Sequence, residues 1–189
     1  QLGQDIDGDY SDQSGWSVSM SDDGNIVAVG APGHDVQSIQ NVGRVKIYNW
    51  NGIYWDQLGQ DISGEGWGAN CGKSVSLNSA GNSLAIGSPG FDDIAGTGWG
   101  AVGNVRIYNW DGSSWIQWGQ NIIGEAGSDE SGWSVSLSSD GNTVAIGAPY
   151  NDGNGNGAGH VRIYSVGQYT SPPCSGCTDS LAVNYDPYS

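Results

Sequence analysis

A glycine-rich loop near the end of the chain has the residue types of a calcium-binding loop. In the stretch NDGNGNGAGH, Asp152, Asn154 and Asn156 place side-chain oxygens at every second position around a turn that glycine permits. Proteins bind Ca²⁺ with oxygen ligands of this kind, although the glutamate that closes a standard loop is missing here. The pattern predicts a calcium site, and an ordinary Asn-Gly turn is the alternative.

A second group of acids stands in the opening stretch DIDGDYSD, which contains Asp5, Asp7, Asp9 and Asp12. Four carboxylates so close together in the sequence are a second predicted site for a hard cation such as Ca²⁺.

Charged residues that recur at equivalent positions suggest that Asp9 forms a structural ion pair. An acid recurs at Asp9, Glu65 and Glu125, and a cation recurs at Lys46, Arg106 and Arg162. We therefore predict that Lys46, Arg106 and Arg162 form structural ion pairs with Asp9, Glu65 and Glu125, which would need no ligand.

Tryptophans provide the candidate ligand-binding residues. Trp67 and Trp99 lie in the glycine-rich stretches GEGWGAN and GTGWGAV and have no counterpart elsewhere in the chain, so we predict that they stack on sugar rings. The other tryptophans recur, and we predict that they are structural. Trp50 and Trp55, like Trp110 and Trp115, flank a turn and form cross-strand pairs, whereas Trp16 and Trp133 pack between sheets.

Charge and histidine content argue against several functions. The net charge is −15, from 20 acidic and five basic residues that form no patch, which disfavours nucleic acid and anionic membranes as partners. His34 and His160 accompany no nucleophile motif, so we predict no catalytic residue and no enzymatic activity. No apolar run approaches the roughly 18 residues of a membrane span.

The elements that position these residues are three copies of one sequence pattern. SGWSVSMSDDGNIVAVGAP begins at Ser14, CGKSVSLNSAGNSLAIGSP at Cys71 and SGWSVSLSSDGNTVAIGAP at Ser131. The connector QLGQDI begins at Gln1 and at Gln57 and returns as QWGQNI at Gln117. RVKIYNW, NVRIYNW and HVRIYSV close the three copies.

Each copy predicts four short antiparallel strands. WSVSMS alternates apolar and polar residues, DDGN is a tight-turn sequence, and IVAVGAP is an apolar run typical of a strand covered on both faces. RVKIYNW and the QLGQDI connector supply the other two strands. Four strands in about 40 to 60 residues indicate a β-propeller blade, and a β-solenoid or a duplicated sandwich is the alternative.

The pattern GxSVSLSxDGNxVAIGAP…GxVRIY resembles the FG-GAP repeat of integrin-α-type β-propellers, in a secreted bacterial or marine-type variant. The resemblance extends to residue 166 and implies an all-β chain of three blades, used for adhesion or scaffolding outside the cell. It does not imply catalysis. Members of that family often carry a DxDxDG calcium loop between their first two strands, but SDDGN, NSAGN and SSDGN are too short for one here.

The repeats divide the chain into five predicted segments. Residues 1–55, 56–115 and 116–167 form the three blades, 168–176 form a linker, and 177–189 begin a cysteine-bounded module. Cys71, Cys174 and Cys177 are an odd number, so their pairing stays open, with extracellular disulfide use favoured over zinc.

The order of strands predicts self-association. If each connector is an outermost strand, the chain has a spare one at its start, and the third repeat lacks one. That spare strand consists of Gln1, Leu2, Gly3, Gln4, Asp5 and Ile6. Three blades are fewer than the roughly four that close a ring. We therefore predict an extracellular, non-catalytic structural or adhesive protein whose blades join head to tail, as a dimer or a filament, by strand completion. A calcium-supported lectin is the alternative.

Overall fold

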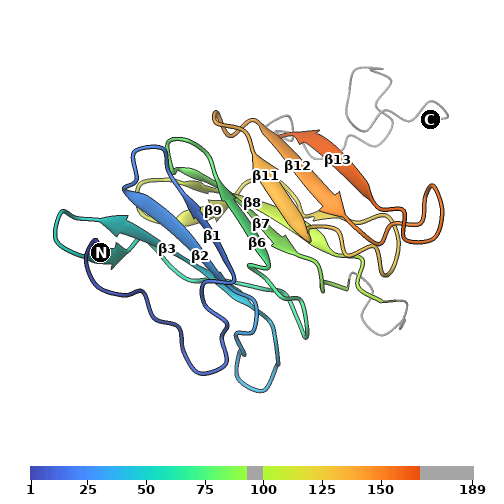
Figure 1. Ribbon diagram of the computed structural model, residues 1–189, viewed down its shortest axis with the longest axis horizontal. Coiled ribbons are helices and arrows are strands. Elements are labelled where there is room, and N and C mark those ends of the chain that lie inside the picture. The colour runs from blue at the N-terminus through green and yellow to red at the C-terminus, as the bar shows by residue number, and fades with distance from the viewer. Residues whose placement is uncertain (93–99, 167–189) are drawn as a thin grey trace.

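The computed structural model describes residues 1–92 and 100–166, and within these ranges the chain consists of strands and turns without a helix (Figure 1). The strands form three antiparallel sheets, so the predicted all-β class is confirmed. Trp99, Cys174, Cys177, the predicted linker and the predicted cysteine-bounded module lie outside the described residues.

The first two sheets have the same five strands in the same arrangement. Blade 1 contains β1 (Ser17–Met20), β2 (Ile26–Ala31), β3 (Arg44–Trp50), β4 (Trp55–Gln57) and β5 (Ile62–Ser63). Blade 2 contains β6 (Ser74–Leu77), β7 (Ser83–Ser88), β8 (Asn104–Trp110), β9 (Trp115–Gln117) and β10 (Ile122–Ile123). In each, the first four strands pair in order, and the short fifth strand also pairs with the third.

Blade 3 has three strands in the described part of the chain. They are β11 (Ser134–Leu137), β12 (Thr143–Ala148) and β13 (His160–Ser165), which pair in that order. The sequence of each middle strand explains its place: β2 and β7 are apolar on both faces and are buried over most of their length, as the continuous apolar runs predict.

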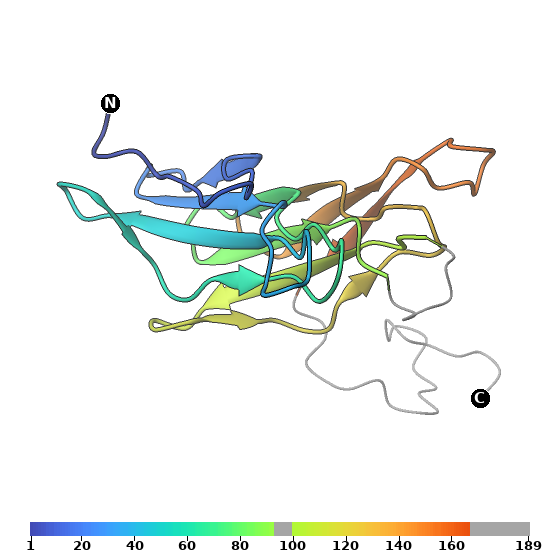
Figure 2. The ribbon, with the colours of Figure 1, turned by 90° about the horizontal axis from the view of Figure 1, so that it is seen from below.

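The blades stack face to face, with blade 2 between blades 1 and 3, so that blades 1 and 3 form the opposite ends of the molecule (Figures 1 and 2). Small residues let the sheets approach closely. The Ser17 hydroxyl donates to the Gly72 carbonyl at 2.7 Å, and the Ser74 hydroxyl donates to the Gly132 carbonyl at 2.8 Å. The same contact therefore joins blade 1 to blade 2 and blade 2 to blade 3.

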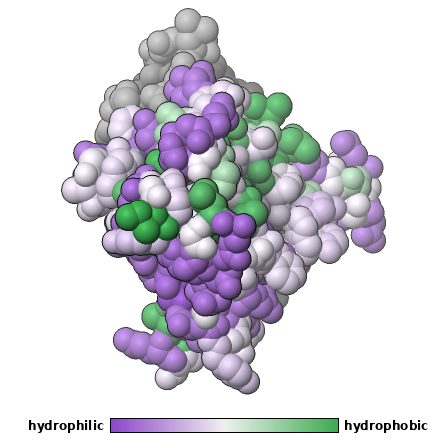
Figure 3. All heavy atoms as spheres, turned by 60° about the vertical axis from the view of Figure 1, so that its left-hand side comes forward, coloured by the Kyte–Doolittle hydropathy of each residue, from purple (hydrophilic) through white to green (hydrophobic). Residues whose placement is uncertain are grey.

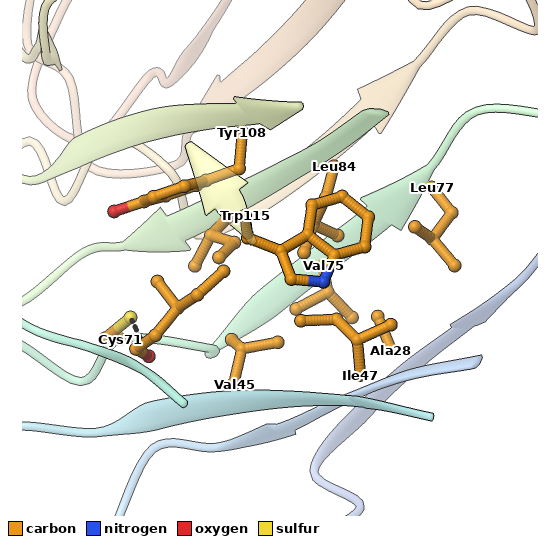
Figure 4. Packing of buried hydrophobic residues seen from close by; sticks show 11 residues of the cluster. Ala28, Val45, Ile47, Cys71, Val75, Leu77, Leu84, Tyr108 and Trp115 are labelled. Carbon is orange, nitrogen blue, oxygen red and sulfur yellow. Dashed lines mark hydrogen bonds between the residues drawn. The ribbon is translucent and has the colours of Figure 1, made fainter. Parts of the chain in front are cut away.

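Two hydrophobic clusters fill the spaces between the blades. The cluster between blades 1 and 2 combines Ile47 of β3 with Leu84 and Tyr108 of blade 2, and the Trp115 indole lies among them (Figure 4). The cluster between blades 2 and 3 is built from Ile107, Leu137 and Ile146 and their neighbours. Each core thus belongs to a pair of blades, which is the expected organisation of a stacked repeat protein.

The connectors differ from the prediction in two ways. Residues 57–62 begin in β4 and end in β5, so they complete the sheet of the preceding repeat and do not open the next one. The sheets therefore divide the chain later than the predicted boundaries at residues 55 and 115. In addition, Gln1–Ile6 forms no strand, because within the described chain no blade precedes blade 1 and offers an edge to pair with.

Candidate functional site

Two of the acids at the start of the chain contact an arginine. Arg44 of β3 is buried, and its guanidinium contacts Asp9 and Asp12 and lies 3.3 Å from an Asp61 carboxylate oxygen. Asp12 also accepts a hydrogen bond from His34 Nδ1 at 3.0 Å. The carboxylates of Asp9, Asp12 and Asp61 therefore neutralise the buried charge of the Arg44 guanidinium.

Burial opposes ionisation of Asp12, but the hydrogen bond from His34 and the positive charge of Arg44 outweigh it and hold the pKa of Asp12 below its ordinary value of 3.8. Asp5 accepts a hydrogen bond from the Gln1 side chain at 2.7 Å. Among residues 1–92 and 100–166, no three His, Cys, Asp or Glu side chains form a group that could hold a metal ion. Of the four acids of the first stretch, Asp9 and Asp12 thus contact Arg44.

Two of the three predicted ion pairs are present in the structure. Arg106 Nη1 lies 3.6 Å from Glu65 Oε1, and Arg162 Nη1 lies 3.5 Å from Glu125 Oε1. In the first repeat the structure corrects the prediction, because the partner of Asp9 is Arg44 and not Lys46. The two cations lie two residues apart on β3, a spacing that the sequence pattern did not distinguish.

Arg106 also contacts the buried side chain of Cys71. Its Nη2 donates to the Ser63 carbonyl at 2.7 Å and lies 3.4 Å from the Cys71 sulfur. Burial raises the pKa of the Cys71 thiol, and the nearby charge of Arg106 only partly offsets this effect. Within the described residues Cys71 is a free, buried thiol, and it packs as a small core residue at the junction of blades 1 and 2.

The predicted calcium loop adopts a turn that its own residues stabilise. Asp152 Oδ1 accepts a hydrogen bond from the backbone N–H of Gly157 at 2.6 Å, and the Asp152 carbonyl accepts one from Gly155 at 3.0 Å. The carbonyl contact is that of a β-turn, and the side-chain contact closes the loop across five residues. The structure therefore gives the loop a folding role, and Ca²⁺ binding there stays a prediction.

Trp67 lies on the surface in a hollow. Its side chain is 75% exposed, and the hollow is also lined by Glu65, Phe91 and Asp92. An exposed indole beside carboxylates has the components of a sugar-binding surface, in which the ring stacks and the acids accept hydrogen bonds.

Trp16 and Trp133 are more exposed than the prediction of inter-sheet packing implies, at 53% and 40%. Lys73, from the equivalent position of the second repeat, lies between them, with its ammonium 3.8 Å from the Trp16 ring centroid and 4.8 Å from that of Trp133. A cation–π contact therefore joins the three repeats at this point.

A contact that recurs between the repeats was not predicted from the sequence. We call it the tryptophan clamp, because a connector segment binds a tryptophan of the following hairpin. Trp115 donates its backbone N–H to the Gln60 side-chain oxygen at 3.1 Å and accepts from the Gln60 amide at 2.6 Å. Its indole N–H donates to the Leu58 carbonyl at 3.0 Å. An added Cβ on Gly59 would lie 2.7 Å from the Trp110 ring, so only glycine allows this close approach.

The same clamp exists in the first repeat. Trp55 forms the equivalent hydrogen bonds with Gln4, at 3.2 and 2.9 Å, and with the Leu2 carbonyl, at 3.1 Å. The segment Gln1–Ile6 therefore lies against the β3–β4 hairpin of its own chain. Trp55 and Trp115 are also cross-strand partners of Trp50 and Trp110, as predicted. The repetition of QxGQ before each hairpin was a signal that could have revealed the clamp.

Comparison with known proteins agrees with the repeat and the fold. Residues 124–164, which include β11, β12 and all of β13 except its last residue, match the family model of the FG-GAP repeat. The chain therefore contains an FG-GAP repeat, and the resemblance inferred from the sequence is confirmed. A search of the curated proteins found no match. Within the described ranges the chain has no helix with the length and apolar character of a membrane span.

Two solved structures share the propeller-like fold. A candidate 6-phosphogluconolactonase of Bacteroides uniformis has a TM-score of 0.53 and 12% identity, over 82% of this chain and 38% of that protein. Hydrazine synthase of Kuenenia stuttgartiensis has a TM-score of 0.51 and 10% identity, over 88% of this chain and 36% of that one. The chain spans less than two fifths of either structure, and likeness at this identity concerns the fold alone.

Proposed function

We propose that this chain is a non-catalytic, extracellular structural or adhesive module whose FG-GAP-type blades associate end to end with a second copy. The observation that carries the proposal is a pair of exposed blade faces, one at each end of the stack, whose sequence equivalents are buried inside the molecule. FG-GAP repeats are typically extracellular, which supports the location.

The face of blade 3 that points away from blade 2 is the first of these surfaces. We call it the trailing face, and it consists of Ser134, Ser136, Ala145, Gly147, Val161 and Ile163. Val161 and Ile163 are 67% and 70% exposed, whereas the equivalent residues of blades 1 and 2 are at most 2% exposed. Those equivalents are buried because another blade covers them.

The face of blade 1 that points away from blade 2 is the complementary surface. We call it the leading face, and it consists of Val18, Met20, Val27, Val29, Lys46 and Tyr48, of which Val27 and Val29 are buried within the chain. Val18 and Met20 are 64% and 53% exposed, but the equivalent Val75 and Leu77 of blade 2 are 8% and 7% exposed. Figure 3, which brings the blade 1 end forward, shows hydrophobic side chains gathered among hydrophilic ones on this side of the molecule. Exposed apolar surface of this kind is typical of protein interfaces, which supports association through this face.

Polar groups on the two faces match as well. Inside the molecule, the Leu77 N–H donates to the Ser19 hydroxyl and the Leu137 N–H to the Ser76 hydroxyl, both at 2.9 Å. Ser136 is the equivalent acceptor on the trailing face, and Met20 carries the equivalent donor on the leading face. We expect the Met20 N–H of a second copy to bond Ser136, which extends the stack by the contact that already joins its blades.

Strand completion fits the same arrangement. Residues 57–63 form the outer edge of blade 1, with Leu58 N–H bonded to the Ile47 carbonyl at 2.7 Å. The segment Gln1–Asp7 has nearly the same sequence, and within the described residues β13 pairs only with β12. A second copy docked on the trailing face would bring its Gln1–Asp7 to this free edge, while keeping its clamp on Trp55. Such a head-to-tail contact closes into a ring or grows into a filament.

Sedimentation velocity over a range of concentrations tests the proposal. The wild-type chain is expected to form dimers or longer chains as concentration rises, and Ile163→Lys and Met20→Lys are each expected to be monomeric and folded. Mixing the two variants should restore a one-to-one heterodimer, because each retains the face that the other has lost. A monomeric wild type at millimolar concentration would refute end-to-end association, and a mixture that stays monomeric would refute its head-to-tail geometry.

The exposure of Trp67 supports a second candidate, a calcium-supported lectin in which Trp67, Trp99 and the Asp152 loop act together. Glycan-array binding that requires Ca²⁺ and is lost in Trp67→Ala would favour this function. Binding that is absent with and without Ca²⁺ would eliminate it.

A further inference from the structure

A third copy of the clamp is present, but within the described residues it lacks the tryptophan that the clamp would bind. Trp118, Gly119 and Gln120 occupy the positions of Leu58, Gly59 and Gln60 in the connector after blade 2. Within the described part of the chain the Gln120 side chain makes no hydrogen bond, whereas Gln4 and Gln60 each make two with a tryptophan backbone.

A cavity of about 260 Å³ lies beside this third clamp. We call it the indole slot, and its lining includes Ile107, Trp118, Gln120, Ile122, Tyr164 and Val166. The cavity is formed by equivalents of the residues that surround Trp115. Ile47 and Tyr108 belong to the cluster in which the Trp115 ring is buried (Figure 4). Ile107 and Tyr164 are their counterparts one blade further on.

The sheet edge next to the slot is free to accept a strand. In blade 2, β9 pairs with the end of β8, and Trp115 lies opposite Trp110. The counterpart of Trp110 in blade 3 is Val166, whose N–H bonds the Asn142 carbonyl at 2.7 Å just as that of Trp110 bonds Asn82 at 2.9 Å. The edge is therefore held in the same conformation, with its outward side unpaired within the described residues.

We infer that the indole slot is a peptide-binding site for a tryptophan in an extended strand of another polypeptide. The strand pairs antiparallel with the end of β13, with its tryptophan opposite Val166. Its indole fills the slot and donates to the Trp118 carbonyl, and Gln120 bonds both backbone groups of the tryptophan. This is β-strand addition with one aromatic anchor.

The chain's own sequence after Val166 does not match this ligand. Residues 167–173 read GQYTSPP, with no tryptophan and with two prolines at the positions that correspond to the strand β9. Proline cannot donate to a sheet ladder, so this segment is a poor outer strand. We therefore expect a strand that carries tryptophan to be supplied by another polypeptide, and the recognition does not depend on the end-to-end association proposed above.

Fluorescence polarisation with a dye-labelled peptide tests the inference. The probe is NWDGSSWIQ, the sequence of residues 109–117, added to the full chain. We expect saturable binding, at least about ten-fold weaker when the peptide residue that corresponds to Trp115 is alanine, because burial of the indole supplies the anchor. In the protein, Gln120→Ala should weaken binding by about ten-fold.

A matched variant separates the slot from general effects on the fold. Gln4→Ala removes the same side chain from a clamp that Trp55 already occupies, so it should leave peptide affinity unchanged. Absence of saturable binding by the folded protein would overturn the inference. Equal binding by wild type, Gln120→Ala and Gln4→Ala would also overturn it, because the peptide would then bind elsewhere.

Discussion

Gln60 holds Trp115 by both of its backbone polar groups, accepting from its N–H at 3.1 Å and donating to its carbonyl at 2.6 Å. The two residues belong to adjacent repeats, so this contact fastens the connector of blade 1 to the outer strand of blade 2. Because Trp115 is 1% exposed and lies in the core between the blades, the clamp also determines how that core is filled.

Loss of the Trp115 side chain should destabilise the protein strongly. We expect Trp115→Ala to lower the free energy of unfolding by about 3 to 5 kcal/mol, because it leaves a large cavity between two blades. Chemical denaturation monitored by circular dichroism measures this effect. The matched control is Trp67→Ala, which removes an exposed ring and should change stability by less than about 0.5 kcal/mol. Similar losses for both variants would contradict the assigned core.

The clamp itself should be measurable without removing the ring. Gln60→Ala leaves the Trp115 backbone groups without their side-chain partners, and we expect a loss of about 2 kcal/mol. Gln120→Ala removes the same residue type from a clamp with no tryptophan, and we expect a change below about 0.5 kcal/mol. If Gln120→Ala were as costly as Gln60→Ala in thermal or denaturant unfolding, the indole slot would have to be occupied within the chain.

A glycine pair distinguishes covered from uncovered blade faces. A Cβ added at Gly87 would lie 2.0 Å from the Gly132 carbonyl oxygen of the next blade, so Gly87→Ala should cost more than about 2 kcal/mol. At the equivalent Gly147, the nearest atom is the rotatable hydroxyl of Ser134 in its own sheet. Gly147→Ala should therefore change stability by less than about 1 kcal/mol.

The same substitution also tests self-association, because Gly147 lies on the trailing face. If a second copy docks there as blade 3 docks on blade 2, the added methyl group meets its backbone, and association should weaken at least about ten-fold. Sedimentation of the folded Gly147→Ala variant measures this. Unchanged association would show that the trailing face is not the contact.

Acid should weaken the first blade through Asp12. The pKa of Asp12 is lowered in the folded protein, so its ionised form contributes stability at neutral pH. That contribution is complete above the ordinary value of 3.8 and is lost as pH falls below it, through the lower pKa of the folded state. Asp12→Asn should be less stable than wild type at pH 7, and the difference should shrink in denaturation curves measured below pH 4. A difference that is independent of pH would argue against the charged contact with Arg44.

Much of the fold could be read from the repeats. The alternation in β1, the apolar runs of β2 and β7, and the Trp50–Trp55 and Trp110–Trp115 pairs were all predicted, because strand period and turn residues are local properties of the chain. The family resemblance followed from the same pattern. Local pattern could not assign the connector to a sheet, since either neighbouring blade offered a β edge of similar sequence.

By itself, the sequence determined that the chain forms short strands and that they recur in three copies. Tertiary structure alone decided which groups meet across blades: Asp9 with Arg44 in place of Lys46, Gln60 with Trp115, and Lys73 between two indoles. It also decided that Val161 and Ile163 are exposed while their equivalents are buried. The physical reason is that equivalent side chains are buried where a neighbouring blade packs on them and exposed where none does, and the sequence of one repeat does not show which case applies.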